Sequence, residues 1–296
     1  MSFEQVLQYI FSGITVGSIY AVVAIGFNII YNSTGIINFA QGEFVMMGGI
    51  IAHSFTPTMP LFLAVVLAVV ITTAVGSLIE LVFIRSLKNP SVLRMIIITI
   101  GLSILIREIA LHIWDEKIRA LPFFTGSEVT SITIFGAHIS PQVLWVLGIT
   151  ALIVVALQFF FYFTFTGQAM RACAANRKAA SLCGINTRKM VNLSFCLSAA
   201  IGAVAGCTVS PLTQTHYAMG TPLAIKGFTV AILGGLGNST AAVLAGLLLG
   251  LLESFSISLL PMAYKDVIAI SILLLILFFR PGGLFQSRQI VALKSF

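Results

Sequence analysis

The chain has 296 residues, of which 58% are hydrophobic and 8% are charged, and its mean hydropathy is +1.07. Because a soluble domain has roughly 25% charged residues, this composition excludes a soluble globular protein and indicates a chain built for a lipid bilayer. The net charge of +7 would suggest a nucleic-acid partner in a soluble protein, but in a membrane protein it follows from basic cytoplasmic loops. We therefore expect a single transmembrane domain over 1–296 and no bound nucleic acid.

Apolar windows of about 20 residues, the length that crosses a bilayer as a helix, recur along the chain. They predict spans at 7–30, 60–84, 92–113, 141–164, 191–211 and 264–280. Two further apolar regions are less regular: 38–55 is short and begins with polar residues, and 219–258 is broken by the glycine-rich run 234–239 into a short piece and a longer one. Nine spans result if each broken piece crosses the membrane, and eight if the piece near 225–236 is re-entrant. The predicted fold is an all-α polytopic membrane protein of eight to nine transmembrane or re-entrant helices.

Lys and Arg in the short loops predict the orientation. In the nine-span arrangement, most of them lie on one side of the membrane, together with the basic segment 171–189. The basic segment and the carboxyl terminus are therefore expected in the cytoplasm. The longest external loop, about 114–140, is polar, and its residues 129–136 are compatible with a small strand or hairpin arm, or with a plain connector.

No catalytic constellation is visible. The glycine-rich run 234–237 has no following Lys, so the phosphate-binding G-x-x-x-x-G-K-[ST] loop is missing. The four histidines have no i, i+4 pairing or carboxylate neighbours at ligand spacing. We expect no catalytic residue, no metal and no cofactor on this chain, and any ATP chemistry would belong to another chain.

Polar and glycine residues at 31–44 form the first candidate element of a transport path. Such a break between apolar spans is tolerated only where it lines a cavity or is packed in protein. Asn38 and Gln41 resemble a capping box, which predicts a helix start. The amino-terminal amides near Gly42 and Glu43 would then favour an anionic group such as a substrate carboxylate. A simple cytoplasmic turn before a capped helix is the alternative.

The second broken element is 226–238, in the opposite half of the chain. Paired glycine-interrupted segments in corresponding halves point to a site at the interface of two internal repeats. The two elements are only weakly similar in sequence, so the repeat is a hypothesis. Together they give the predicted path residues Asn38, Gln41, Gly42, Glu43, Gly234, Gly235 and Gly237.

Ionisable residues within the predicted spans are expected to be paired or functional, because inserting a lone charge into a membrane costs a few kcal/mol. These residues are Glu43, Glu80, Arg107, Glu108, Lys226, Glu253 and Asp266. Arg107 lies deep enough to need a partner, and Glu253 is a candidate. Structural pairs are favoured over a proton relay, which would need carboxylates or histidines in sequence along one path.

Arg171–Lys189 is a basic island between long apolar runs. Its alanines favour a helix, Gly184 is expected to end that helix, and its charges keep it out of the lipid core. One interpretation is an interfacial helix held by anionic lipid. The other is a helix that docks in a groove of a partner.

The island carries a resemblance to a known family. Ala179–Ile185 resembles the A-A-x-x-x-G core of the coupling loop in bacterial ABC importer permeases, and Arg171–Asn186 more closely resembles the version in branched-chain amino acid permeases of the LivH type. Lys178 departs from the general motif, which usually has an acidic residue there. The likeness covers essentially the full chain and includes 26–31, 38–43, 228–237 and 280–285.

The resemblance implies a permease subunit of an ATP-driven importer in the bacterial inner membrane. A cytoplasmic coupling loop would occupy about 165–190, with a coupling helix that seats in the ATPase. The coupling residues would be Arg177, Lys178, Ala179, Ala180, Gly184 and Ile185. Expected partners are a second, related permease subunit in a heterodimer or homodimer, two ATP-binding cassette subunits, a periplasmic substrate-binding protein and membrane lipid.

Import of Leu, Ile, Val or similar apolar amino acids is the activity that the resemblance implies, whereas close relatives carry urea or short amides. The competing classes are an ion-coupled secondary carrier and a structural membrane scaffold. In such importers the binding protein selects the substrate before the permease meets it, so the sequence of the permease does not name the ligand.

Overall fold

The computed structural model describes residues 3–87, 91–127, 130–134, 137–259, 264–280 and 282–284. Within these residues, six helices are long and apolar enough to cross a membrane. They are α1 (Phe3–Thr34), α3 (Leu61–Ile79) with the π-helical turn η1 (Glu80–Ile84), α4 (Val92–Trp114), α5 (Pro141–Phe163), α8 (Thr187–Thr213) and α10 (Ser239–Leu259). The shorter helices are α2 (Gln41–Phe55), α6 (Phe165–Ala175), α7 (Arg177–Leu182), α9 (Gly220–Gly234) and α11 (Lys265–Phe279). The chain is thus a multi-pass helical membrane protein, as its composition predicts.

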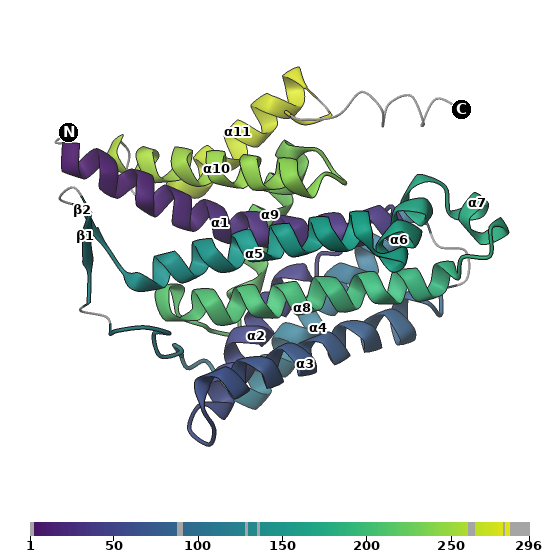
Figure 1. The fold of residues 1–296 in the computed structure, drawn as a ribbon, viewed down its shortest axis with the longest axis horizontal. Coiled ribbons are helices and arrows are strands. Elements are labelled where there is room, and N and C mark those ends of the chain that lie inside the picture. The colour runs from purple at the N-terminus through teal and green to yellow at the C-terminus, as the bar shows by residue number, and fades with distance from the viewer. Residues whose placement is uncertain are drawn as a thin grey trace.

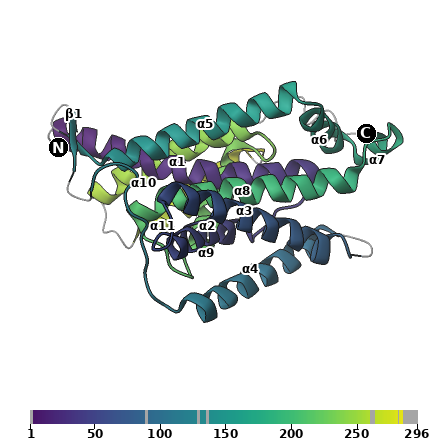
Figure 2. The same ribbon diagram turned by 60° about the horizontal axis from the view of Figure 1, so that its bottom comes forward.

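The apolar windows locate the helices to within a few residues of their ends. They succeed because several helices are apolar on all sides. In the most apolar window of α5 only 17% of the residues are buried, against 72% in α1 and in α8. α1 and α8 therefore form the centre of the bundle, while α4 and α5 lie on opposite sides of that pair (Figure 2).

α1 and α8 pack side by side and run in opposite directions (Figure 1). α10 packs along α1 through glycines spaced four apart, Gly13 and Gly17 on α1 with Gly246 and Gly250 on α10. A Cβ on Gly17 would lie 2.8 Å from the Cα of Leu247. The two backbones approach as closely as small-residue interfaces in membrane proteins allow.

The neighbours of each helix repeat between the two halves of the chain. α10 packs on α1 as α3 packs on α8, and α9 contacts α1 as α2 contacts α8. α4 touches α2, and α11 correspondingly touches α9. Because α1 and α8 are antiparallel, this pattern is that of two inverted repeats, α1–α4 and α8–α11, and it supports the repeat hypothesis.

The two ends of the bundle differ. We call them the hairpin end, where β1 (Ile132–Ile134) pairs antiparallel with β2 (Ala137–Ile139), and the α6–α7 end. Figure 1 shows the first residues of α1 beside the hairpin and α6 and α7 at the opposite end. Within the described residues of 129–136, the strand interpretation is therefore correct.

The basic island folds into two helices, which corrects the expectation of a single one. Asn176 separates α6 from α7 with an extended backbone, φ −155° and ψ 106°. Its Oδ1 accepts a hydrogen bond from the backbone N–H of Ala179 at 3.0 Å, so it caps α7. Gly184 follows α7 with φ +83°, a conformation that glycine adopts without strain, and the helix ends near it as predicted.

Candidate functional site

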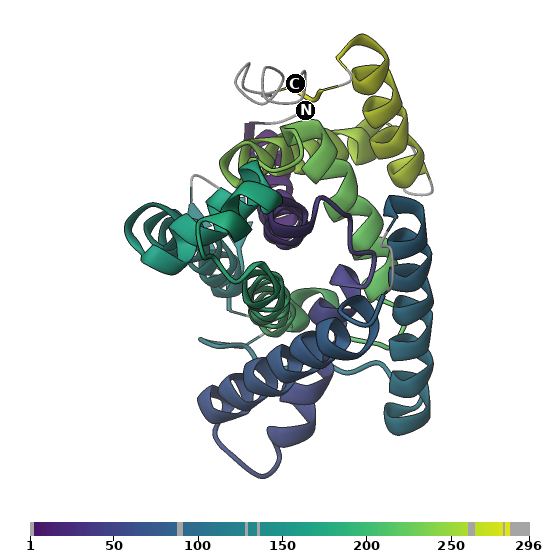
Figure 3. The ribbon, with the colours of Figure 1, turned by 90° about the vertical axis from the view of Figure 1, so that its right-hand side faces the viewer.

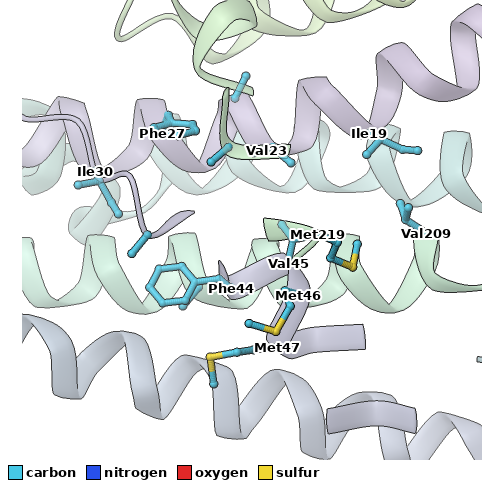
Figure 4. Packing of buried hydrophobic residues seen from close by; sticks show 14 of the residues in the cluster. Ile19, Val23, Phe27, Ile30, Phe44, Val45, Met46, Met47, Val209 and Met219 are labelled. Atoms are coloured by element: carbon cyan, nitrogen blue, oxygen red, sulfur yellow. The ribbon is translucent and has the colours of Figure 1, made fainter. Parts of the chain in front are cut away.

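The first broken element meets the start of α9 inside the bundle, whereas the second element, 226–238, begins later in α9. α2 and α9 both begin there, and their first turns are in contact, because a Cβ on Gly42 would overlap the carbonyl oxygen of Gly220. Figure 4 shows Phe44, Val45 and Met46 of α2 and Met219, the residue before α9, among the buried side chains between the central helices. The amino-terminal ends of two short helices therefore converge in the interior.

Glu43 lies at this convergence and is fully buried. Its Oε1 accepts hydrogen bonds from Ser103 Oγ of α4 at 2.8 Å and from Thr221 Oγ1 of α9 at 3.4 Å. Its Oε2 has no hydrogen-bond partner among the described residues and lies against Gly220. The carboxylate thus joins three helices, and the partial positive charge at the start of α9 favours a negative group there.

Gln41 is buried between the central helices. Its Oε1 accepts from Ser198 Oγ of α8 at 2.5 Å, and its Nε2 donates to the Ser198 carbonyl at 3.3 Å. A Cβ on Gly26 of α1 would overlap the Gln41 side chain. The predicted capping box is therefore wrong, because Gln41 is engaged with α8 and Asn38 instead accepts from the backbone N–H of Ala40 at 3.1 Å.

The pairing of Glu253 with Arg107 is also corrected. Glu253 of α10 forms a buried ion pair with Lys226 of α9, and Tyr20 of α1 donates a hydrogen bond to its Oε2 at 2.9 Å. Arg107 instead lies 3.7 Å from the neighbouring Glu108, and both side chains are partly exposed. The reason is the helix arrangement, since α10 packs against α9 and α1, whereas α4 packs against α2.

The predicted glycines Gly234, Gly235 and Gly237 form the end of α9 and the turn into α10. Gly235 and Gly237 have φ of +96° and +93°. The turn is fastened to α1, because Asn28 Oδ1 accepts from the N–H of Gly237 at 3.0 Å and Asn32 Nδ2 donates to its carbonyl at 2.9 Å. The sequence analysis includes Asn32 in the candidate element 31–44 but does not name either asparagine as a site residue, although two Asn spaced four apart in an apolar helix are a visible signal.

A cavity of about 980 Å³ opens at the α6–α7 end, between the end of α1, α5, α6 and the α9–α10 turn. Of the seven predicted path residues, Gly237 lines it. The other six are packed elsewhere in the described bundle. These six are Asn38, Gln41, Gly42, Glu43, Gly234 and Gly235.

The predicted coupling residues lie together on and after α7. Arg177, Lys178, Ala179 and Gly184 are exposed, Ala180 is buried against the rest of the chain, and Ile185 is half-buried. Sequence reasoning did not single out Leu182, whose side chain is 89% exposed. α7 therefore stands out from the bundle with an apolar residue on its free surface (Figure 1).

Comparison with known proteins gives a consistent result. A family model described as "Branched-chain amino acid transport system / permease component" matches residues 9–277. The high-affinity branched-chain amino acid transport system permease protein BraD of Pseudomonas aeruginosa is 35% identical, over 94% of this chain and 95% of that protein. The corresponding permease protein LivH of Escherichia coli strain K12 is also 35% identical, over 95% and 96%.

A solved structure supports the fold alone. PsaBC from Streptococcus pneumoniae in complex with Fab has a TM-score of 0.50 and 13% sequence identity, and the match covers 95% of this chain and 94% of that chain. At this identity the likeness concerns the arrangement of helices and carries no information about the substrate.

Proposed function

Because the chain belongs to the family of branched-chain amino acid transport permeases, which it matches over nearly its whole length, we propose that its ligands are branched-chain or other apolar amino acids. The chain is a transport subunit and not an enzyme. We propose further that it carries no cofactor and works in a bacterial inner membrane with a second permease subunit, two ATP-binding cassette subunits and a periplasmic binding protein. Its 35% identical relatives are permease proteins of high-affinity branched-chain amino acid transport systems, which supports this substrate class.

The orientation follows from the charges and the helix directions. Arg171, Arg177 and Lys178 at the α6–α7 end are exposed, so we place this end in the cytoplasm. The carboxyl-terminal segment is proposed on the same side, because the N–H of Leu284 donates to the carbonyl of Leu233 at 2.7 Å and Gly282 lines the same cavity as Arg171. α1 would then begin outside, because its first residues lie at the opposite, hairpin end (Figure 1).

The coupling role of α7 is supported by its exposure. A short helix that projects from the bundle with Leu182 free can enter a groove of an ATPase and bury that side chain there. α7 connects through α6 to α5 and through its own carboxyl end to α8, so a movement of α7 would reach a central helix. We propose that the coupling set acts in this way.

The α2–α9 crossing is our proposal for the core of the path. Two helix amino termini that meet inside a membrane protein offer amides to an anionic group. Gln41 and Glu43 are fully buried. These two residues would fix the position of the two helix ends, and the substrate would pass beside them.

A Gly184→Pro variant tests the coupling role. Proline holds φ near −65°, which is incompatible with the φ of +83° at this position. We expect the complex to assemble and hydrolyse ATP, but uptake per ATP to fall about tenfold or more. The measurement is parallel ATPase and uptake assays in proteoliposomes.

The control for this variant is Gly148→Ala in α5, where an added Cβ meets no atom within 4 Å. It should leave uptake per ATP unchanged. Normal coupled transport by Gly184→Pro would refute the docking role.

The substrate class is tested with the assembled complex. The chain is co-expressed with its partner subunits and binding protein, and ATPase activity is measured with leucine, isoleucine, valine, urea or acetamide. Stimulation by the branched-chain amino acids and not by urea or acetamide is the expected result. Stimulation by urea or acetamide alone would indicate an importer of amides instead. Transport that follows an ion gradient without ATP would contradict the proposed function.

A further inference from the structure

The cavity at the α6–α7 end has features that the transport path does not require. Its floor is apolar and comes from α1, α5 and the end of α9. Its rim is polar and basic, and none of the described residues that line it is acidic. The floor residues include Ile25, Ile29, Val154, Leu157 and Phe161, and the rim residues include Asn32, Gln158, Arg171, Arg177, Asn238 and Thr240.

Arg171 is held in place at the rim. Its guanidinium carbon lies 4.5 Å from the centroid of the Tyr162 ring, a cation–π contact. A second hollow of about 430 Å³ is lined by Tyr162, Gln168, Arg171 and Ala172. Arg171 and Tyr162 therefore border both hollows, and the guanidinium is available to a ligand on either side.

Arg177 adds a second positive charge. Burial raises the pKa of the Cys173 thiol, and the nearby Arg177 charge partly opposes this rise. Cys173 and Arg177 both line the cavity. Two guanidiniums without a carboxylate at the rim favour an anion, and Arg binds phosphate in a bidentate manner.

The rim lies at the level expected of a membrane surface. The carboxyl end of α5 and the start of α6 expose aromatic side chains, with Tyr162 at 60%, Phe163 at 74% and Phe165 at 91%. Aromatic residues gather where the hydrocarbon core meets the headgroups. Figure 3, a view from the α6–α7 end, shows α5 and α6 on the outside of the bundle beside α1.

We propose that this cavity binds an anionic phospholipid, with the phosphate at Arg171 and Arg177 and an acyl chain on the apolar floor. A soluble anion would use the two arginines but has no need of the apolar floor. A zwitterionic lipid such as phosphatidylcholine would use the floor, but its choline cation finds no carboxylate among the described lining residues and is repelled by the two guanidiniums. Basic pockets between helices at the membrane surface recognise such headgroups. Since Arg177 also begins α7, bound lipid would stabilise the position of the projecting helix.

The test is native mass spectrometry of the full chain, purified in complex with its partner subunits and titrated with phosphatidylglycerol or phosphatidylcholine. The wild-type protein should retain phosphatidylglycerol in preference. Arg171→Gln should weaken phosphatidylglycerol binding about fivefold, the effect of one basic residue near an anionic surface, and should leave phosphatidylcholine unchanged. Val154→Trp keeps both arginines and fills the floor, so it should weaken phosphatidylglycerol binding as well.

Arg188→Gln is the matched control, because it removes the same charge from an exposed site at the same end that does not line the cavity. It should bind phosphatidylglycerol as the wild type does. Equal retention of the two lipids by the wild type, or equal effects of the two arginine variants, would overturn the proposal. Displacement of phosphatidylglycerol by inorganic phosphate or free leucine, with no effect of Val154→Trp, would show a site for a soluble anion instead.

Discussion

Gly42→Ala is expected to destabilise the protein and to reduce transport strongly. The added methyl group would overlap the carbonyl oxygen of Gly220 and lie 2.7 Å from its carbonyl carbon and 2.9 Å from the Cβ of Ala224. Two of these atoms belong to backbone, so no side-chain rotation relieves the overlap, and α2 and α9 must separate. Overpacking of this kind costs about 1–3 kcal/mol or more. We expect a lower melting temperature and an uptake rate reduced more than tenfold.

Gly101→Ala in α4 is the matched control. It is also a glycine within a helix, but its added Cβ meets no atom within 4 Å. Alanine favours a helix over glycine by about 1 kcal/mol, so this variant should be as stable as the wild type or more so. Wild-type uptake and melting temperature in Gly42→Ala would contradict the close crossing of α2 and α9.

The sequence alone was sufficient to locate the outer helices. α4 and α5 present apolar side chains to their surroundings on most sides, so a window of hydropathy finds them without knowledge of their neighbours. The same windows marked α2 and α9 as irregular, and the polar residues responsible, such as Gln41 and Lys226, do have partners inside the bundle.

Partners across the bundle were beyond the reach of the sequence. Arg107 and Lys226 are both basic residues in apolar helices, and nothing in the local pattern says which of them lies beside Glu253. The choice depends on α10 packing against α9, which is a consequence of the repeat arrangement. The local sequence predicts a capping role for Gln41 for the same reason, because its partner Ser198 is 157 positions away in the chain.

The position of the predicted path residues shows a second limit of prediction from sequence. Polar residues in a membrane protein satisfy the same sequence criterion whether they line a path or are packed in protein. Gly42 and Glu43 belong to the packed kind in this structure, at the meeting point of two helix ends. The cavity at the α6–α7 end, by contrast, is built by α1, α5, α6 and the α9–α10 turn, and no single segment of sequence reveals it.

Breaking the buried ion pair of Lys226 and Glu253 is expected to destabilise the protein strongly. Lys226→Met leaves the Glu253 carboxylate, which is 1% exposed, without its ammonium partner. Breaking a buried pair from one side costs about 3–5 kcal/mol, so most of this variant should fail to reach the membrane as folded protein. The purified remainder should melt well below the wild type.

Lys226→Met combined with Glu253→Gln should recover most of the loss. The double variant contains no unpaired charge, and the side-chain carbonyl of the introduced glutamine can still accept the hydrogen bond that Tyr20 donates to Glu253 at 2.9 Å. Removing both charges of a buried pair is often close to neutral, unlike removing one. Melting temperatures of the two single variants and the double variant form a double-mutant cycle, which isolates the coupling between the two sites. If the two losses simply add, the pair does not hold α9 to α10, and the joining of these helices then depends on the α9–α10 turn and its contacts with Asn28 and Asn32.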